Sequence, residues 1–169
     1  MLALLETLFD IIRLRKGPDA IPYSWGLCLF ILLLWMVAGF AITLTTPEMT
    51  DRDFLVAMLT SVAGLACYAA IIVLGGKAPR LLQTVTAIFG CGALLSLLSV
   101  AVDVVLSPLL SDDAANIVVT LVLLWSVPVE GHIIARAIDR QWFVGILIAM
   151  AVFILQFYLF AILNPDPVT

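Results

Sequence analysis

The segment Trp125-Ser126-Val127-Pro128-Val129-Glu130-Gly131-His132 decides how the rest of the chain is interpreted. It places a carboxylate and the only histidine of the chain within a long apolar run, beside a proline that kinks helices. A charged residue at the centre of a membrane span costs about 2.5–3.5 kcal/mol, so it is retained only with a partner or a purpose. The segment therefore indicates a membrane environment and a candidate functional centre.

The composition extends this interpretation to all 169 residues. Only 12% of the residues are charged, about half the share in soluble proteins, and the mean hydropathy is +1.21. The length provides several spans of about 20 residues each and leaves almost nothing for a domain outside the membrane. We therefore expect one membrane domain over residues 1–169, embedded in the lipid bilayer, with no basic patch for nucleic acid and no evident soluble substrate.

The hydropathy pattern predicts an all-α bundle of five transmembrane helices preceded by a short amphipathic helix. Residues 1–16 carry Glu6, Asp10 and Arg13 at helical spacing among apolar side chains, and end in basic residues before Gly17-Pro18. We expect this helix to lie along the cytoplasmic membrane surface. The predicted spans cover residues 25–44, 54–74, 81–106, 115–136 and 141–163.

The positions of the basic residues predict the orientation. If the N-terminus is cytoplasmic, Arg52 is the only basic residue of the sequence on the outer side. The seven inner basic residues are Arg13, Arg15, Lys16, Lys77, Arg80, Arg136 and Arg140. By the positive-inside rule, the N-terminus is cytoplasmic and the C-terminus lies outside. We expect a bacterial inner membrane, with an endoplasmic reticulum or Golgi membrane as the alternative.

Two predicted spans carry small or hydroxyl residues at helical spacing. These residues are Ala57, Ser61 and Gly64 in the span 54–74 and Gly92, Ser96 and Ser99 in the span 81–106. Because small residues allow close helix contact in lipid, we interpret them as packing seams. The alternative is a small oligomeric transporter or channel, in which Ser96, Ser99 and Asp103 line a polar path together with Glu130.

Glu130 and its neighbours are the leading polar candidates. Glu130 lies six residues before Arg136, about 9 Å from the inner end of its span at 1.5 Å per residue. One interpretation is an ion pair with Arg80, Lys77 or Arg136; the other is a proton or ligand site beside the Pro128 kink. His132 is expected to face the headgroup region or another helix. The candidate polar residues are Glu130, His132, Arg136, Asp103 and Arg80.

The reactive side chains do not favour an enzyme. Cys91 lies about 15 Å from the inner end of its span and His132 only about 6 Å from its own, so a nucleophilic pair is not expected. Cys28, Cys67 and Cys91 are interpreted as small buried hydrophobes, and a Cys67–Cys91 disulfide is disfavoured. One histidine and three scattered thiols form no metal cluster, and we expect no cofactor.

The pattern Trp125…Glu130-Gly131-His132…Ala135-Arg136-Ala137…Arg140-Gln141, with five spans and Gly17-Pro18 before the first, resembles the Yip family of Ypt/Rab-interacting membrane proteins. The resemblance covers roughly residues 15–163. The long cytosolic N-terminal region of the eukaryotic members is missing, which disfavours GTPase binding and points to a compact bacterial member. The resemblance implies a non-enzymatic adaptor that contacts itself or other membrane proteins through its helices, and no catalytic residue.

Overall fold

The computed structural model describes residues 2–45, 50–106 and 112–164, and these residues form helices joined by short connections. The long helices are α2 (Trp25–Thr45), α3 (Asp51–Leu74), α4 (Leu81–Leu106), α5 (Asp112–Ala137) and α6 (Trp142–Leu163). They are preceded by α1 (Leu2–Ile12) and by the short 3-10 turn η1 (Pro18–Ala20), and a second such turn, η2 (Ala78–Arg80), leads into α4.

The five long helices are each long and apolar enough to cross a membrane. Their ends agree with the predicted spans to within three residues, which confirms the prediction of an all-α chain with five helices long and apolar enough to span a membrane. The largest differences are at the starts of α3 and α5. Thr50 begins α3 earlier than predicted because its hydroxyl accepts a bond from the Asp53 N–H, while the Asp53 carboxylate accepts one from the Thr50 N–H.

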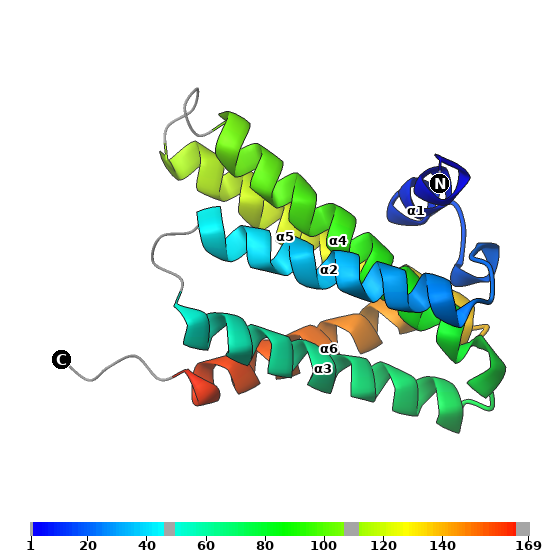
Figure 1. Cartoon of the computed structure of the whole chain (residues 1–169). Coiled ribbons are helices and arrows are strands. Elements are labelled where there is room, and N and C mark those ends of the chain that lie inside the picture. Colours follow the sequence, from blue (N-terminus) through cyan, green and yellow to red (C-terminus); the bar gives the residue numbers. More distant parts are fainter. Residues whose placement is uncertain (1, 46–49, 107–111, 165–169) are drawn as a thin grey trace.

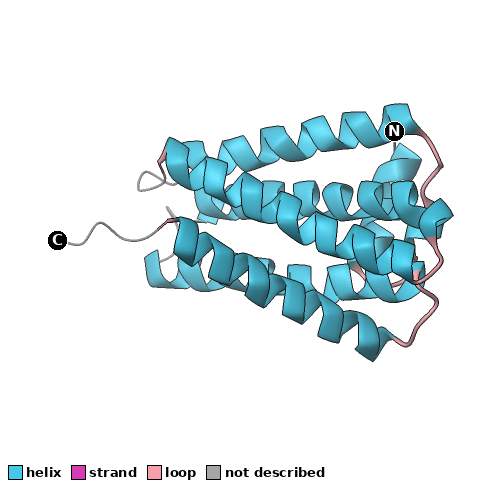
Figure 2. Cartoon of the chain, turned by 90° about the horizontal axis from the view of Figure 1, so that it is seen from below, coloured by secondary structure: helices cyan, strands magenta, loops and turns pink. Residues whose placement is uncertain are grey.

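The helices form two layers. One layer contains α2, α4 and α5, and the other contains α3 and α6 (Figure 1). In the turned view of Figure 2 the long helices again run side by side, with the loops at the two ends. Helix α6 connects the two layers, since it packs on α5 as well as on α3.

The layers meet where α5 crosses α6. A side-chain carbon added at Gly131 would lie 2.8 Å from the Cα of Ile146, and one at Gly145 would lie 2.7 Å from the Cβ of Ala135. Only glycine permits such an approach of two backbones. Because Gly131 and Ala135, like Gly145 and Ala149, are four residues apart, each helix presents a small-residue surface to the other.

The end of the bundle that carries the connections around residues 75–80 and 138–141 is called the basic end below. Asp139 accepts bonds from Lys77 Nζ and Arg80 Nη1, each at 2.6 Å. Arg80 Nη1 also donates to the backbone oxygens of Arg136 and Ala137 at 3.2 Å. The two basic side chains lower the pKa of Asp139 to about 2. These contacts join the α3–α4 connection to the α5–α6 connection.

Helix α1 packs beside α4 near the basic end, with the buried Leu8 against Gly90 (Figure 1). The sequence analysis predicted that this helix would extend to residue 16, but it ends at Ile12. Leu14 adopts a left-handed backbone (φ 61°), which lets the N–H groups of Arg15 and Lys16 bond to the Asp10 carbonyl oxygen. Lys16 Nζ also lies 2.8 Å from the Asp10 carboxylate and lowers its pKa.

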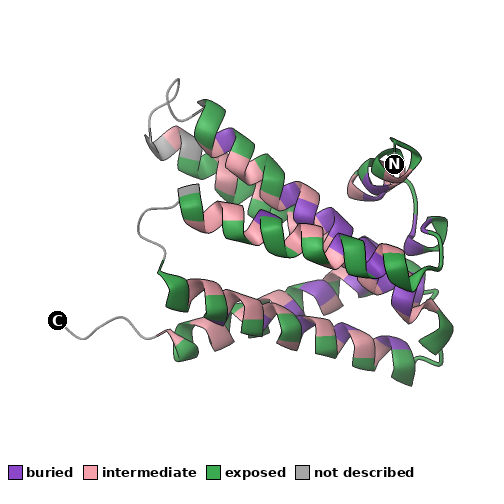
Figure 3. Ribbon diagram, viewed as in Figure 1, coloured by how far each residue is buried: buried purple, intermediate pink, exposed green. Residues whose placement is uncertain are grey.

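The buried side chains gather mostly in the half of the bundle beside α1 (Figure 3). In α5, Ile117, Leu121 and Leu124 are exposed, whereas Val127 and Val129 are buried. The packed core of the molecule therefore lies in the half of the bundle that includes the basic end. Any site that requires shielding from lipid is expected there.

Candidate functional site

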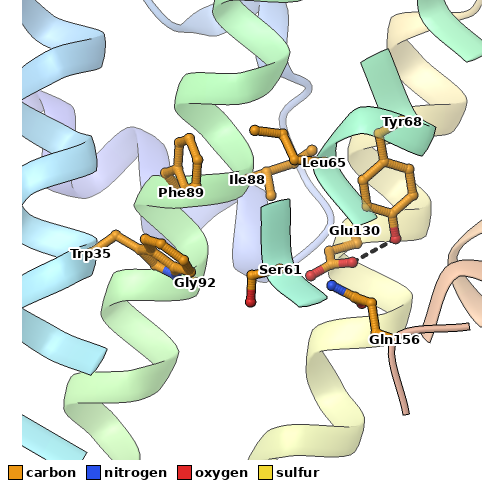
Figure 4. A pocket seen from close by; sticks show the side chains of 9 residues that line it. All are labelled: Trp35, Ser61, Leu65, Tyr68, Ile88, Phe89, Gly92, Glu130 and Gln156. Atoms are coloured by element: carbon orange, nitrogen blue, oxygen red, sulfur yellow. Dashed lines mark hydrogen bonds between the residues drawn. The ribbon is translucent and has the colours of Figure 1, made fainter. Parts of the chain in front are cut away.

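Glu130 lies within the bundle, facing α3. Its Oε2 accepts a hydrogen bond of 2.6 Å from the hydroxyl of Tyr68 on α3 (Figure 4). Tyr68 lies six residues before the end of α3 at Leu74, which corresponds to about 9 Å of helix, so the bond forms well below the end of the bundle. Of the two interpretations of Glu130, the ion pair is therefore wrong: its carboxylate binds Tyr68, and Lys77 and Arg80 pair with Asp139 instead.

A cavity of about 90 Å³ borders this bond and is called the central pocket below. Its lining residues are Trp35, Ser61, Leu65, Tyr68, Ile88, Phe89, Gly92, Glu130 and Gln156 (Figure 4). Each of the five spanning helices contributes at least one of them. The volume is sufficient for several water molecules, and the carboxyl, phenol, amide and hydroxyl groups would supply their hydrogen bonds.

Gln156 closes one side of the pocket. Its Nε2 donates to the backbone oxygen of Thr60 at 3.3 Å, and its side chain lies directly over Gly64 on α3. A side chain at position 64 would collide with this amide. On the other side, Trp35 lies over Gly92, and its ring centroid is 5.0 Å from that of Phe89. Gly64 and Gly92, two of the small residues that the sequence analysis singled out, thus leave space for the side chains of Gln156 and Trp35.

The structure brings some of the predicted site residues to the central pocket and leaves others away from it. Glu130, Ser61 and Gly92 line the pocket. Ser96, Ser99 and Asp103 are not among its lining residues; the Ser99 hydroxyl donates to the Leu95 carbonyl oxygen at 3.1 Å. Ala57 is half-buried and lies on α3, where its carbonyl oxygen accepts a bond from the Thr60 hydroxyl.

His132 and Cys91 bind the N-terminal segment and not each other. His132 Nε2 donates to the backbone oxygen of Lys16 at 3.0 Å, and the Cys91 thiol lies 3.9 Å from the backbone oxygen of Leu8. Trp125 Nε1 donates to the Ile12 carbonyl oxygen at 3.2 Å. Side chains of α4 and α5 therefore hold the segment from α1 to Lys16 through its carbonyl oxygens.

The sequence analysis missed Tyr68, Gln156 and Trp35. Gln156 carried a usable signal, because it is the only amide side chain in the apolar run 142–163. Tyr68 and Trp35 resemble ordinary aromatic residues of a membrane span, so their role becomes visible only once Glu130 is placed beside them. The thiols of Cys28, Cys67 and Cys91 are all free.

The polar side chains of the central pocket are a carboxyl, a phenol, an amide and a hydroxyl group. Within the described parts of the chain, no three His, Cys, Asp or Glu side chains gather closely enough to hold a metal ion. Comparison of the chain with protein-family models, with curated proteins and with solved structures gave no match. The argument for a function therefore starts from the contacts of Glu130 and from the surfaces of the bundle.

Proposed function

We propose that the protein is a non-catalytic membrane adaptor or accessory subunit that binds another integral membrane protein, or a second copy of itself, through its helices. In this proposal it resides in a bacterial inner membrane with its basic end in the cytoplasm, in the manner of a compact Yip-like protein. The positive-inside distribution of the basic residues supports this orientation. The amphipathic helix α1 then lies at the cytoplasmic surface, with Leu2 and Phe9 directed outward.

The observation that carries this proposal is the outward surface of α6. Of the five long helices, this one is the most apolar and also the least buried. Gly145, Ala149 and Val152 face inward, whereas Leu147, Met150 and Ile154 are exposed along the opposite side. A continuous apolar surface of this length is available for helix contacts within the bilayer.

The Tyr68–Glu130 bond supports the same proposal. It joins α3 of one layer to α5 of the other, and the acid is satisfied by a neutral group of the protein itself. A central pocket of about 90 Å³ is large enough for a few water molecules but too small for a solute of metabolite size. We infer that the bond fixes the relative position of the layers and thereby the shape of the outer surface.

The experiment is site-specific photocrosslinking in native membranes. A photoreactive residue is introduced at Met150 or Ile154 on α6, and at Leu33 or Val37, which are similarly exposed on α2, as the comparison. We expect discrete protein adducts from α6 and only lipid adducts from α2. If all four positions yield only lipid adducts, the adaptor proposal fails.

A second candidate function is proton transfer through the membrane. The specific observation in its favour is that all five spanning helices contribute to a polar pocket around Glu130, since intramembrane acids often mark proton paths. In liposomes loaded with a pH-sensitive dye, this candidate predicts proton flux that Glu130→Gln abolishes and Tyr158→Phe leaves intact. Absence of flux in the unmodified protein, or unchanged flux in Glu130→Gln, would exclude it.

A further inference from the structure

A second pocket, called the basic-end pocket below, opens where η1 meets the start of α4 and the end of α5. Its volume is about 160 Å³. The lining residues are Pro18, Asp19, Arg80, Gln83, Arg136 and Asp139. It is separate from the central pocket, and neither the Glu130 site nor the adaptor proposal uses it.

The pocket offers hydrogen-bond donors that the protein leaves unused. Among the described residues, the guanidinium of Arg136 has no hydrogen-bond or ion-pair partner, while its Cβ and Cγ rest against Gly17. The contacts of Arg80 are all made by Nη1, so its Nη2 and Nε stay available. Gln83 is already committed, because its amide donates to the Ile21 carbonyl oxygen at 2.6 Å.

The two carboxylates of the pocket differ in whether they have an ion-pair partner. Asp139 is occupied by Lys77 and Arg80. Asp19 has no partner within the described part of the chain, and it forms no ion pair with Arg136 or Arg80 although all three line the same pocket. Free guanidinium donors and a free carboxylate thus border one space without contacting each other, which suits a ligand that carries charges of both signs.

The pocket lies at the ends of two of the helices that are long and apolar enough to span a membrane. Arg80 immediately precedes the first residue of α4, and Arg136 is one residue before the end of α5. The exposed Tyr23 and Trp25, at the start of α2, are aromatic residues of the kind that mark the interface between membrane and water. In a membrane spanned by these helices, phospholipid headgroups would lie within reach of the pocket.

We propose that the basic-end pocket binds the headgroup of a phospholipid that carries a primary ammonium group, with its phosphate on Arg136 and Arg80 and its ammonium on Asp19. Guanidinium groups bind phosphate oxygens through charge-assisted hydrogen bonds. A primary ammonium donates hydrogen bonds to a carboxylate, whereas the quaternary ammonium of a choline headgroup has no N–H to donate. The pocket therefore favours ethanolamine over choline headgroups.

The test measures lipid binding to the full-length protein in detergent by native mass spectrometry. Short-chain lipids with the same acyl chains and ethanolamine, choline or glycerol headgroups are titrated separately. We expect the ethanolamine lipid to bind about tenfold more tightly than the choline lipid, the equivalent of one good hydrogen bond. Asp19→Ala should remove this preference, because alanine has no side-chain acceptor for the ammonium, and Arg136→Gln should weaken binding of the ethanolamine lipid about tenfold.

The matched control is Arg140→Gln, which removes the same charge from the same end of the bundle but outside the pocket lining. We expect it to leave the affinity nearly unchanged. An equal loss in both arginine variants, or equal binding of the ethanolamine and choline lipids by the unmodified protein, would overturn the proposal. Displacement of the lipid by an equal concentration of inorganic phosphate would do so as well. If Arg136→Gln does not fold, the comparison of lipids on the unmodified protein decides alone.

Discussion

Tyr68 and Glu130 are the pair whose chemistry matters most for the interior of the molecule. In the adaptor proposal their hydrogen bond holds α3 against α5, and the acid has no other task. Tyr68→Phe removes the donor and should lower the free energy of unfolding by about 0.6–1.7 kcal/mol, the range of hydrogen bonds between membrane helices. Glu130→Gln should cost less, because the amide oxygen still accepts the bond.

Unfolding of the purified protein in mixed micelles with increasing sodium dodecyl sulfate measures both variants. Tyr158→Phe is the control, since Tyr158 is 63% exposed on α6 and should be insensitive to loss of its hydroxyl. A loss in Glu130→Gln larger than that in Tyr68→Phe would mean that the carboxyl group itself, and not its hydrogen bond, is needed.

Asp139 makes the stability of the basic end depend on pH. Its pKa in the folded protein is about 2, below the usual 3.8, because Arg80 and Lys77 stabilise the carboxylate. A lowered pKa means that the stabilisation is fully present above about pH 4 and is lost as the pH falls through about 2. Since Asp139 is exposed, salt should weaken the effect.

The measurement is the unfolding midpoint in detergent between about pH 5 and about pH 2, at low and high salt. The unmodified protein should lose more stability in this interval than Asp139→Asn, and the difference should shrink in high salt. Parallel pH profiles for the two proteins would contradict the assigned role of Asp139.

The crossing of α5 and α6 is the contact on which the position of the helices depends most. Gly145→Ala places a methyl group against the Gly131 carbonyl oxygen and the Ala135 side chain. We expect a loss of about 1–3 kcal/mol, as for other overpacked sites. Gly26→Ala is the matched control, because the nearest atom to the added methyl group is 3.9 Å away. Equal free energies of unfolding for the two variants would show that the close approach of α5 and α6 at Gly145 does not contribute to stability.

The helix boundaries were predictable, whereas the contacts between helices were not. Hydrocarbon thickness sets the length of an apolar run, and polar or glycine-rich stretches such as Gly75-Gly76 interrupt it, so the ends of the spans follow from the local sequence. The early end of α1 follows instead from the left-handed Leu14, and the segment after it is held by the bond from His132 to Lys16. That partner lies 116 residues away and has no local signature.

The candidate site was likewise predictable in its position but not in its contacts. Glu130 was identified because a carboxylate is rare in an apolar run, but one of its two interpretations placed its partner among the basic residues, whereas the partner is Tyr68. Charge alone favours an ion pair, whereas the packing of α3 on α5 leaves Arg80 and Lys77 beyond the end of the span, next to Asp139. The sequence therefore indicated where the site lies and not what completes it.

The molecule as a whole is a two-layer bundle in which every basic residue except Arg52 lies toward one end, where the N-terminal segment, the basic-end pocket and the Asp139 contacts are also found. Both the adaptor proposal and the lipid proposal depend on which side of the membrane this end faces. With the basic end in the cytoplasm, Gln141 faces the cytoplasm and Asp51 the outside; both residues are exposed at opposite ends of the bundle.

The most direct test is cysteine labelling in intact cells, in a variant whose three native cysteines are replaced by alanine. A maleimide that does not cross membranes should label Asp51→Cys, and should label Gln141→Cys only after the cells are permeabilised. Labelling of both positions in intact cells, or of Gln141→Cys alone, would contradict the five-span orientation.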